Sequence, residues 1–125
     1  MAKKKAGGNE VEEGKVCAIL LYLVWIVGII WYFADDQMRK NKFANYHAKQ
    51  SIVLVITAVA LSIGLSILAA ILIWIPFIGW ALISLLWIAF WIIMLIFVIL
   101  GIINSVNGAQ KPLPIIGQFA KNFKF

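Results

Sequence analysis

The chain has 125 residues, of which 64 % are hydrophobic and only 13 % are charged. Soluble domains contain about 45–50 % apolar and about 25 % charged residues, so this composition excludes an ordinary soluble fold. The single cysteine excludes a disulfide scaffold. The net charge of +6 comes from lysines that flank apolar segments, so it does not indicate nucleic-acid binding. The composition predicts an integral membrane protein, with the lipid bilayer as its first partner.

The chain opens with a polar tail, residues 1–15, whose composition predicts disorder. The charge-free segment 16–33 follows, and it is long enough to cross a bilayer. It ends in Trp31 and Tyr32, aromatic residues typical of the membrane interface. No small-residue cleavage site comes after it, so we expect a retained span rather than a signal peptide.

Residues 34–50 are predicted to be a basic loop. Asp35 and Asp36 open it, and four cations follow, namely Arg39, Lys40, Lys42 and Lys49. These cations could bind lipid phosphates. The alternative is a solvated connecting loop without a lipid contact.

Residues 50–110 contain no charge. As one helix this stretch would be about 90 Å long, three times the bilayer's hydrocarbon core of about 30 Å, so it must reverse. Pro76 cannot continue a helix and Gly79 permits a tight turn. We therefore predict two further spans, residues 51–75 and 79–103, joined as a tight hairpin.

The second predicted span carries a stripe of small residues. They recur every fourth residue, at Ala58, Ser62, Ser66 and Ala70. This spacing lets helix backbones approach closely, so we expect the stripe to pack on another span or another copy. A narrow substrate path along the same face is the alternative.

The last segment, residues 112–125, places apolar residues mostly at i, i+4 steps among lysines, namely Ile115, Ile116, Phe119 and Phe123. It is too short to cross, and its pattern is typical of a helix lying on the membrane surface. The predicted fold is thus an all-α membrane protein with three transmembrane helices and a short amphipathic interfacial segment.

Three spans place the two ends of the chain on opposite sides of the membrane. The loop 34–50 and the C-terminal segment together hold seven Lys and Arg residues, whereas the N-terminal tail holds four. The positive-inside rule then favours a cytoplasmic loop and C-terminus in a multi-pass protein of a prokaryotic plasma membrane.

The predicted spans contain no ionisable side chain suited to coupling a proton or ion. His47 and Cys17 lie at opposite ends of the first predicted span, and no nucleophile–base pair, phosphate loop or dinucleotide motif is present. We therefore expect no catalytic residue, no metal site and no cofactor.

Several short motifs of this sequence together resemble those of a known family. They are residues 43–51 (Phe-Ala-Asn-Tyr-His-Ala-Lys-Gln-Ser), the turn 75–79 and the segment 111–117. The chain resembles a family of small bacterial and archaeal membrane proteins of unknown function, which is similar to the twenty-kilodalton subunit of the chloroplast inner-envelope import translocon. The resemblance implies a multispanning helical subunit of a larger assembly. The chloroplast members are expected to have four spans, whereas this chain indicates three.

Within the matching motif, His47 and Gln50 are spaced to share a helix face. We expect them to tether the loop to the first or third span by hydrogen bonds, with ligand contact as the alternative. The function predicted from the sequence is a non-enzymatic structural or assembly subunit that packs with its own copies or other membrane proteins. The alternative is a passive, translocon-like channel or transporter for a small or apolar solute.

Overall fold

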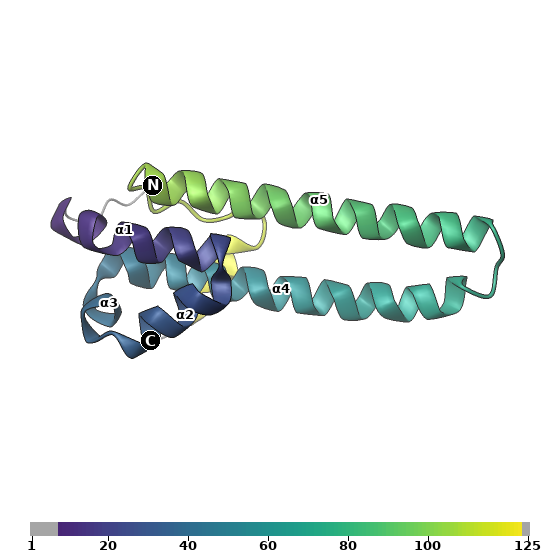
Figure 1. Ribbon diagram of the computed structural model, residues 1–125, viewed down its shortest axis with the longest axis horizontal. Coiled ribbons are helices and arrows are strands. Elements are labelled where there is room, and N and C mark those ends of the chain that lie inside the picture. Colours follow the sequence, from purple (N-terminus) through teal and green to yellow (C-terminus); the bar gives the residue numbers. More distant parts are fainter. Residues whose placement is uncertain (1–7, 124–125) are drawn as a thin grey trace.

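The structure, a computed structural model, describes residues 8–123 as an all-helical chain (Figure 1). Its elements in order are α1 (Gly8–Leu23), α2 (Trp25–Ala34), α3 (Asp36–Lys40), α4 (Lys42–Leu72), α5 (Ile78–Val106) and the 3₁₀ helix η1 (Gly117–Asn122). The first seven residues of the predicted tail and the last two of the predicted interfacial segment lie outside the described residues.

A long hairpin of α4 and α5 dominates the molecule (Figure 1). Of the described helices, these two are long and apolar enough to cross a membrane. Only 11 % of the most apolar stretch of α4, and 22 % of that of α5, is buried within the chain, which is unlike the core of a soluble protein. The chain reverses at the predicted place, where Phe77 adopts a positive φ of 65° and Trp80 Nε1 donates to the Ile73 carbonyl oxygen (3.0 Å).

Helix α4 begins nine residues before the predicted span 51–75. Asn41 caps it, because its side-chain oxygen accepts a hydrogen bond from the Ala44 amide at 3.0 Å. The prediction of a loop over residues 34–50 is therefore wrong, since most of this segment belongs to α3 and to the first turns of α4. All its charged residues except Asp35, which connects α2 to α3, lie on helices rather than in a connection.

The predicted first span, residues 16–33, is not one helix. It breaks at Val24, whose backbone leaves the helical region (φ −129°, ψ 77°), and α2 turns back beside α1. Gly28 permits this close packing: a Cβ there would lie 2.5 Å from the Leu21 backbone nitrogen. The prediction of three transmembrane helices is not confirmed: two of the described helices, α4 and α5, are long and apolar enough to cross, and this segment is folded into a short pair.

Residues 8–15 are helical, contrary to the predicted disorder. This start of α1 is fixed by Glu10, whose carbonyl oxygen accepts from Asn41 Nδ2 (2.8 Å) and whose carboxylate accepts from the Lys42 amide (2.9 Å). The polar composition of this stretch does not reveal these contacts, because their partners lie more than thirty residues along the chain.

After α5 the chain returns along α4. Leu113, Gly117 and Ala120 are buried there, whereas Ile115 and Phe119 point outward and are exposed. The apolar positions predicted to form one amphipathic face therefore divide, because Ile116 packs against the core and Ile115 does not.

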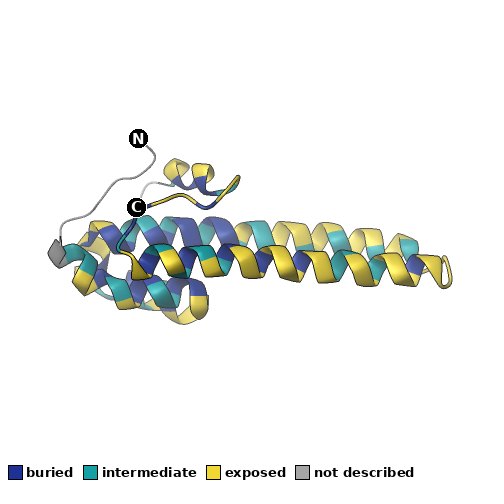
Figure 2. Ribbon diagram, turned by 90° about the horizontal axis from the view of Figure 1, so that it is seen from above, coloured by how far each residue is buried: buried dark blue, intermediate teal, exposed yellow. Residues whose placement is uncertain are grey.

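The short helices gather around one end of the α4–α5 hairpin. We call this the bundle end, and we call residues 60–89, which extend beyond it, the arm. Buried residues concentrate at the bundle end (Figure 2). In the arm only Gly79 is buried, and no residue is charged.

Candidate functional site

His47 lies fully buried on α4 in the bundle end. Its Nδ1 is 2.7 Å from the Tyr22 hydroxyl oxygen, and its Nε2 is 2.9 Å from the Ala109 carbonyl oxygen. A carbonyl oxygen can only accept, so Nε2 carries the proton and Nδ1 accepts from the Tyr22 O–H. Phe43 and Tyr46 pack their rings edge-on against the imidazole. His47 thus joins α1, α4 and the segment after α5.

Gln50 lies one turn further along α4 and contacts the C-terminal segment. Its Oε1 accepts from the Leu113 amide at 3.0 Å, and its Nε2 donates to the Gly117 carbonyl oxygen at 3.0 Å. A Cβ at position 117 would approach Gln50 Oε1 to 2.5 Å, so glycine is needed there. The buried amide therefore bonds the returning chain to α4 in a fixed register.

Two more side chains of α4 contact the α1–α2 pair. Ser51 Oγ donates to the Leu21 carbonyl oxygen at 2.6 Å, and Asn45 Nδ2 donates to the Tyr32 hydroxyl at 2.6 Å. Leu21 lies in the last turn of α1, where carbonyl groups lack partners within the helix. Ser51 satisfies one of these groups where α1 ends.

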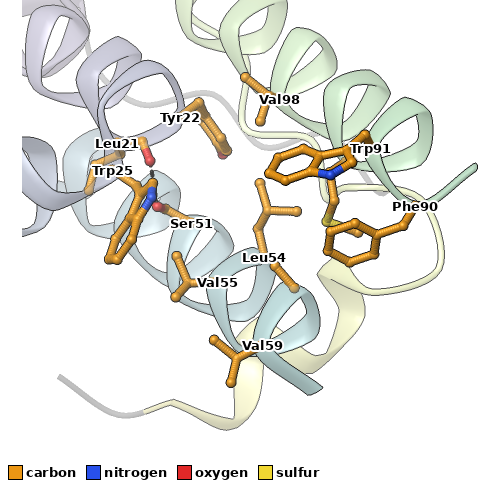
Figure 3. A pocket seen from close by; sticks show the side chains of 12 residues that line it. Leu21, Tyr22, Trp25, Ser51, Leu54, Val55, Val59, Phe90, Trp91 and Val98 are labelled. Atoms are coloured by element: carbon orange, nitrogen blue, oxygen red, sulfur yellow. Dashed lines mark hydrogen bonds between the residues drawn. The ribbon is translucent and has the colours of Figure 1, made fainter. Parts of the chain in front are cut away.

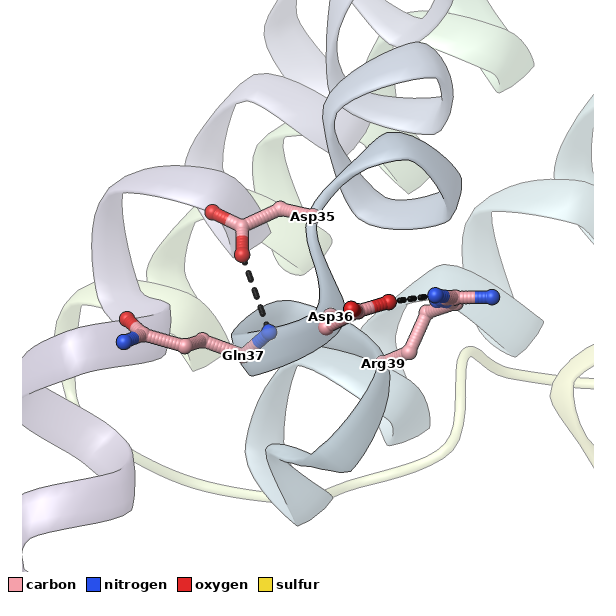
Figure 4. Close-up of polar contacts among 4 residues, drawn as sticks. All are labelled: Asp35, Asp36, Gln37 and Arg39. Atoms are coloured by element: carbon pink, nitrogen blue, oxygen red, sulfur yellow. Dashed lines mark hydrogen bonds and ion pairs between the residues drawn. The ribbon is translucent and has the colours of Figure 1, made fainter.

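The α2–α3 connection is organised by local polar contacts (Figure 4). The Asp35 carboxylate accepts from the Gln37 amide (2.9 Å) and from Trp31 Nε1 (3.2 Å), so it caps α3. Asp36 forms an ion pair with Arg39. Both of these side chains are exposed, so the pair adds little to stability.

Within the part of the chain that the structure describes, every buried side-chain nitrogen or oxygen has a hydrogen-bond partner. In the same residues no three His, Cys, Asp or Glu side chains gather as a metal site. The buried polar groups of the bundle end therefore bond to one another and to the backbone, as in a network that specifies one packing arrangement.

An apolar pocket of about 270 Å³ lies where α1 ends between α4 and α5 (Figure 3). Tyr22 and Trp25 form its wall at the α1–α2 turn, Leu54 and Ala58 line it from α4, and Trp91 lines it from α5. The hydroxyls at its edge, on Tyr22 and Ser51, are already bonded elsewhere. The pocket therefore offers a surface for an apolar group.

The small-residue stripe starts at this pocket. Ala58 lines it, and Ser62, Ser66 and Ala70 follow at i+4 steps, so they form a row that winds slowly around α4 toward the tip of the hairpin. Ser62 is half-buried, whereas Ser66 and Ala70 are exposed. Both serine hydroxyls donate to carbonyl oxygens within α4, at 2.9 and 2.7 Å.

His47 and Gln50 both bond α4 to the segment after α5, whereas the stripe begins at the pocket with Ala58 and continues in the arm. The roles of Tyr22 and Trp25 could not be predicted from the sequence, because both are aromatic residues inside a continuous hydrophobic segment. The small residues Cys17, Ala18 and Gly28 are the sequence feature that could have indicated a close contact between α1 and α2. Cys17 is fully buried, with its Sγ 3.9 Å from the Gly28 carbonyl oxygen.

We expect Gln50→Ala to release the C-terminal segment from α4, because two backbone groups lose their partners. Limited proteolysis in detergent should then cleave the variant within residues 110–123 at least several times faster than the wild type. Gln118→Ala is the matched control, since Gln118 is exposed and its loss should leave cleavage unchanged. Equal cleavage of all three proteins would show that Gln50 does not hold this segment.

Comparison with known proteins gives a consistent result. The magnetosome magnetite crystal formation protein family matches residues 13–120. A UPF0132 membrane protein of Methanocaldococcus jannaschii is 32 % identical over 124 residues, which cover 98 % of this chain and 96 % of the relative. A second UPF0132 membrane protein of the same organism is 31 % identical over 111 residues, 89 % of this chain and 67 % of the relative. No solved structure matches the chain. The likeness covers both the bundle end and the arm.

Proposed function

We propose that this chain, which belongs to the magnetosome magnetite crystal formation protein family, is a non-enzymatic assembly subunit that acts through helix packing. Like its archaeal relatives, it is a membrane protein. The proposed location is the plasma membrane of a prokaryote. The exposed, uncharged arm carries this proposal, because its apolar surface is left open by the rest of the chain.

In the proposed topology α4 and α5 cross the bilayer, and the α1–α2 pair enters it from the bundle end and returns. The start of α1 and the C-terminal segment both lie at that end (Figure 1), so they share one side of the membrane. The turn around Pro76 has no charged residue near it in the sequence. The Lys and Arg residues that the structure describes all belong to α1, α3, the first turns of α4 or the segment after α5. The positive-inside rule then favours a cytoplasmic bundle end.

The proposed packing surface is the edge of α4 beyond the pocket. Helix α1 occupies the groove between α4 and α5 only as far as the level of Ser51. Beyond it the small residues Ser66 and Ala70 are exposed, and small side chains at this spacing let a second helix approach closely. A helix of another copy, or of another membrane protein, would pack against α4 beyond the point where α1 ends.

Cysteine crosslinking in native membranes tests this surface. With the buried Cys17 replaced by alanine, Ser66→Cys is expected to form a disulfide-linked dimer or a crosslink to a partner under mild oxidation. Ile67→Cys is the matched control: Ile67 is 61 % exposed, yet it points about 100° away on the helix. The proposal fails if Ser66→Cys stays monomeric, or if both cysteines crosslink equally.

The pocket supports a second candidate function, passive transport of a small apolar solute between α4 and α5, as in a translocon-like channel. The likeness to the chloroplast import subunit remains a prediction from the sequence. Solute flux into proteoliposomes that does not change with protein content would exclude this candidate.

A further inference from the structure

The two ends of the molecule have different widths. At the bundle end, α1, α2 and the C-terminal segment with η1 lie beside α4 and α5, whereas the arm consists of α4 and α5 alone (Figures 1 and 2). Each helix is about 10 Å across with its side chains. Four helices and η1 therefore occupy roughly twice the cross section of two.

Of the elements added at the bundle end, α2 is itself suited to the hydrocarbon. Helix α2 contains no charged residue, and its exposed residues are all apolar, namely Trp25, Ile26, Val27, Ile30, Phe33 and Ala34. At its far end, Trp31 and Asp35 mark the start of the charged surface. Helix α2 thus presents an apolar face to lipid on the side of the membrane where the bundle end lies.

A protein that displaces more lipid area in one leaflet than in the other is best accommodated where the membrane curves toward the wider end. We propose that this chain is a wedge that prefers curved membrane, with the bundle end on the convex side. The partner is the lipid bilayer itself. This inference rests on the proposed topology, in which α1 and α2 enter only one leaflet.

Sorting between flat and curved membrane tests the wedge. Glu12→Cys, at an exposed position of α1, carries a fluorophore in a Cys17→Ala background. The protein is placed at low density in giant vesicles of phosphatidylcholine alone, so that lipid charge plays no part. A narrow tube is pulled outward, and an impermeant quencher then separates molecules with the bundle end outside from those with it inside.

Molecules with the bundle end outside should be more concentrated in the tube than in the flat membrane. Molecules with the bundle end inside should be depleted. Equal densities for both orientations would overturn the wedge.

A double substitution, Ile26→Lys with Ile30→Lys, should drive α2 out of the hydrocarbon and lower the enrichment toward unity, because lysine at such depth is costly. Ile26→Leu with Ile30→Leu is its control and should sort as the wild type does. If the lysine variant fails to fold, the difference in tube enrichment between the two orientations of the wild type still tests the wedge.

A second label separates this inference from the proposed topology. In a protein that carries fluorophores at both Glu12→Cys and Gln118→Cys, the impermeant quencher should quench both labels of a molecule or neither. If the two labels lie on opposite sides, the proposed topology fails. If they share a side but no sorting occurs, only the wedge fails.

Discussion

Replacing Gly28 by valine is expected to separate α2 from α1. A Cβ at this position would lie 2.5 Å from the Leu21 backbone nitrogen and 2.6 Å from its Cα, and a backbone cannot move aside as a flexible side chain can. Severe overpacking of this kind lowers the free energy of unfolding by about 3 kcal/mol or more. The α1–α2 contact should therefore be lost before α4 and α5 are affected.

The native cysteine gives a direct readout of this separation. Cys17 is fully buried, with its Sγ 3.9 Å from the Gly28 carbonyl oxygen. It should resist a small maleimide in detergent in the wild type and react in the Gly28→Val protein. Gly64→Val is the matched control, since a Cβ at position 64 meets no atom within 4 Å. A Gly28→Val protein whose thiol stays as protected as that of the control would show that the pair does not pack as described.

Replacing His47 by alanine should destabilise the bundle end most strongly among its polar residues. The Tyr22 hydroxyl and the Ala109 carbonyl would both lose their buried partner, at about 1–3 kcal/mol each. The cavity left among the rings of Phe43 and Tyr46 adds to this. We expect a total loss of about 3–5 kcal/mol, measured by reversible unfolding in mixed micelles.

Tyr22→Phe tests the same hydrogen bond from its other side. It removes only the hydroxyl, so the loss should be smaller, about 1–2 kcal/mol. The double variant should lose less than the sum of the two, since both remove one shared contact. Additive losses, or an His47→Ala protein as stable as the wild type, would contradict the network.

The α4–α5 hairpin was predictable from the sequence because a charge-free stretch three times the bilayer thickness must reverse, and Pro76 and Gly79 mark where. The fold-back of α1 and α2 was not, because hydropathy is the same for a segment that crosses and for one that returns. Only the packing of Gly28 against the α1 backbone separates the two. The start of α4 could not be placed from the sequence because charged residues favour a loop, although Asn41 caps a helix there.

The candidate site was predictable only in part. His47 and Gln50 stood out as polar residues at helical spacing in a familiar motif. Their partners Ala109, Leu113 and Gly117 lie about sixty residues away, on a segment whose return along α4 depends on those same bonds. The stripe from Ala58 to Ala70 was visible from its spacing, but its position beyond the end of α1 required the fold.

In the proposed topology the first apolar segment enters the membrane and returns, so that both described ends of the chain share one side. Single cysteines at Glu12, Trp74 and Gln118, in a Cys17→Ala background, can be tested with a membrane-impermeant maleimide on intact and on opened cells. All three positions are exposed. Positions 12 and 118 should react together only in opened cells, whereas position 74 should react in intact cells. Labelling of position 12 together with position 74 in intact cells, with position 118 protected, would place α1 and α2 across the membrane and contradict it.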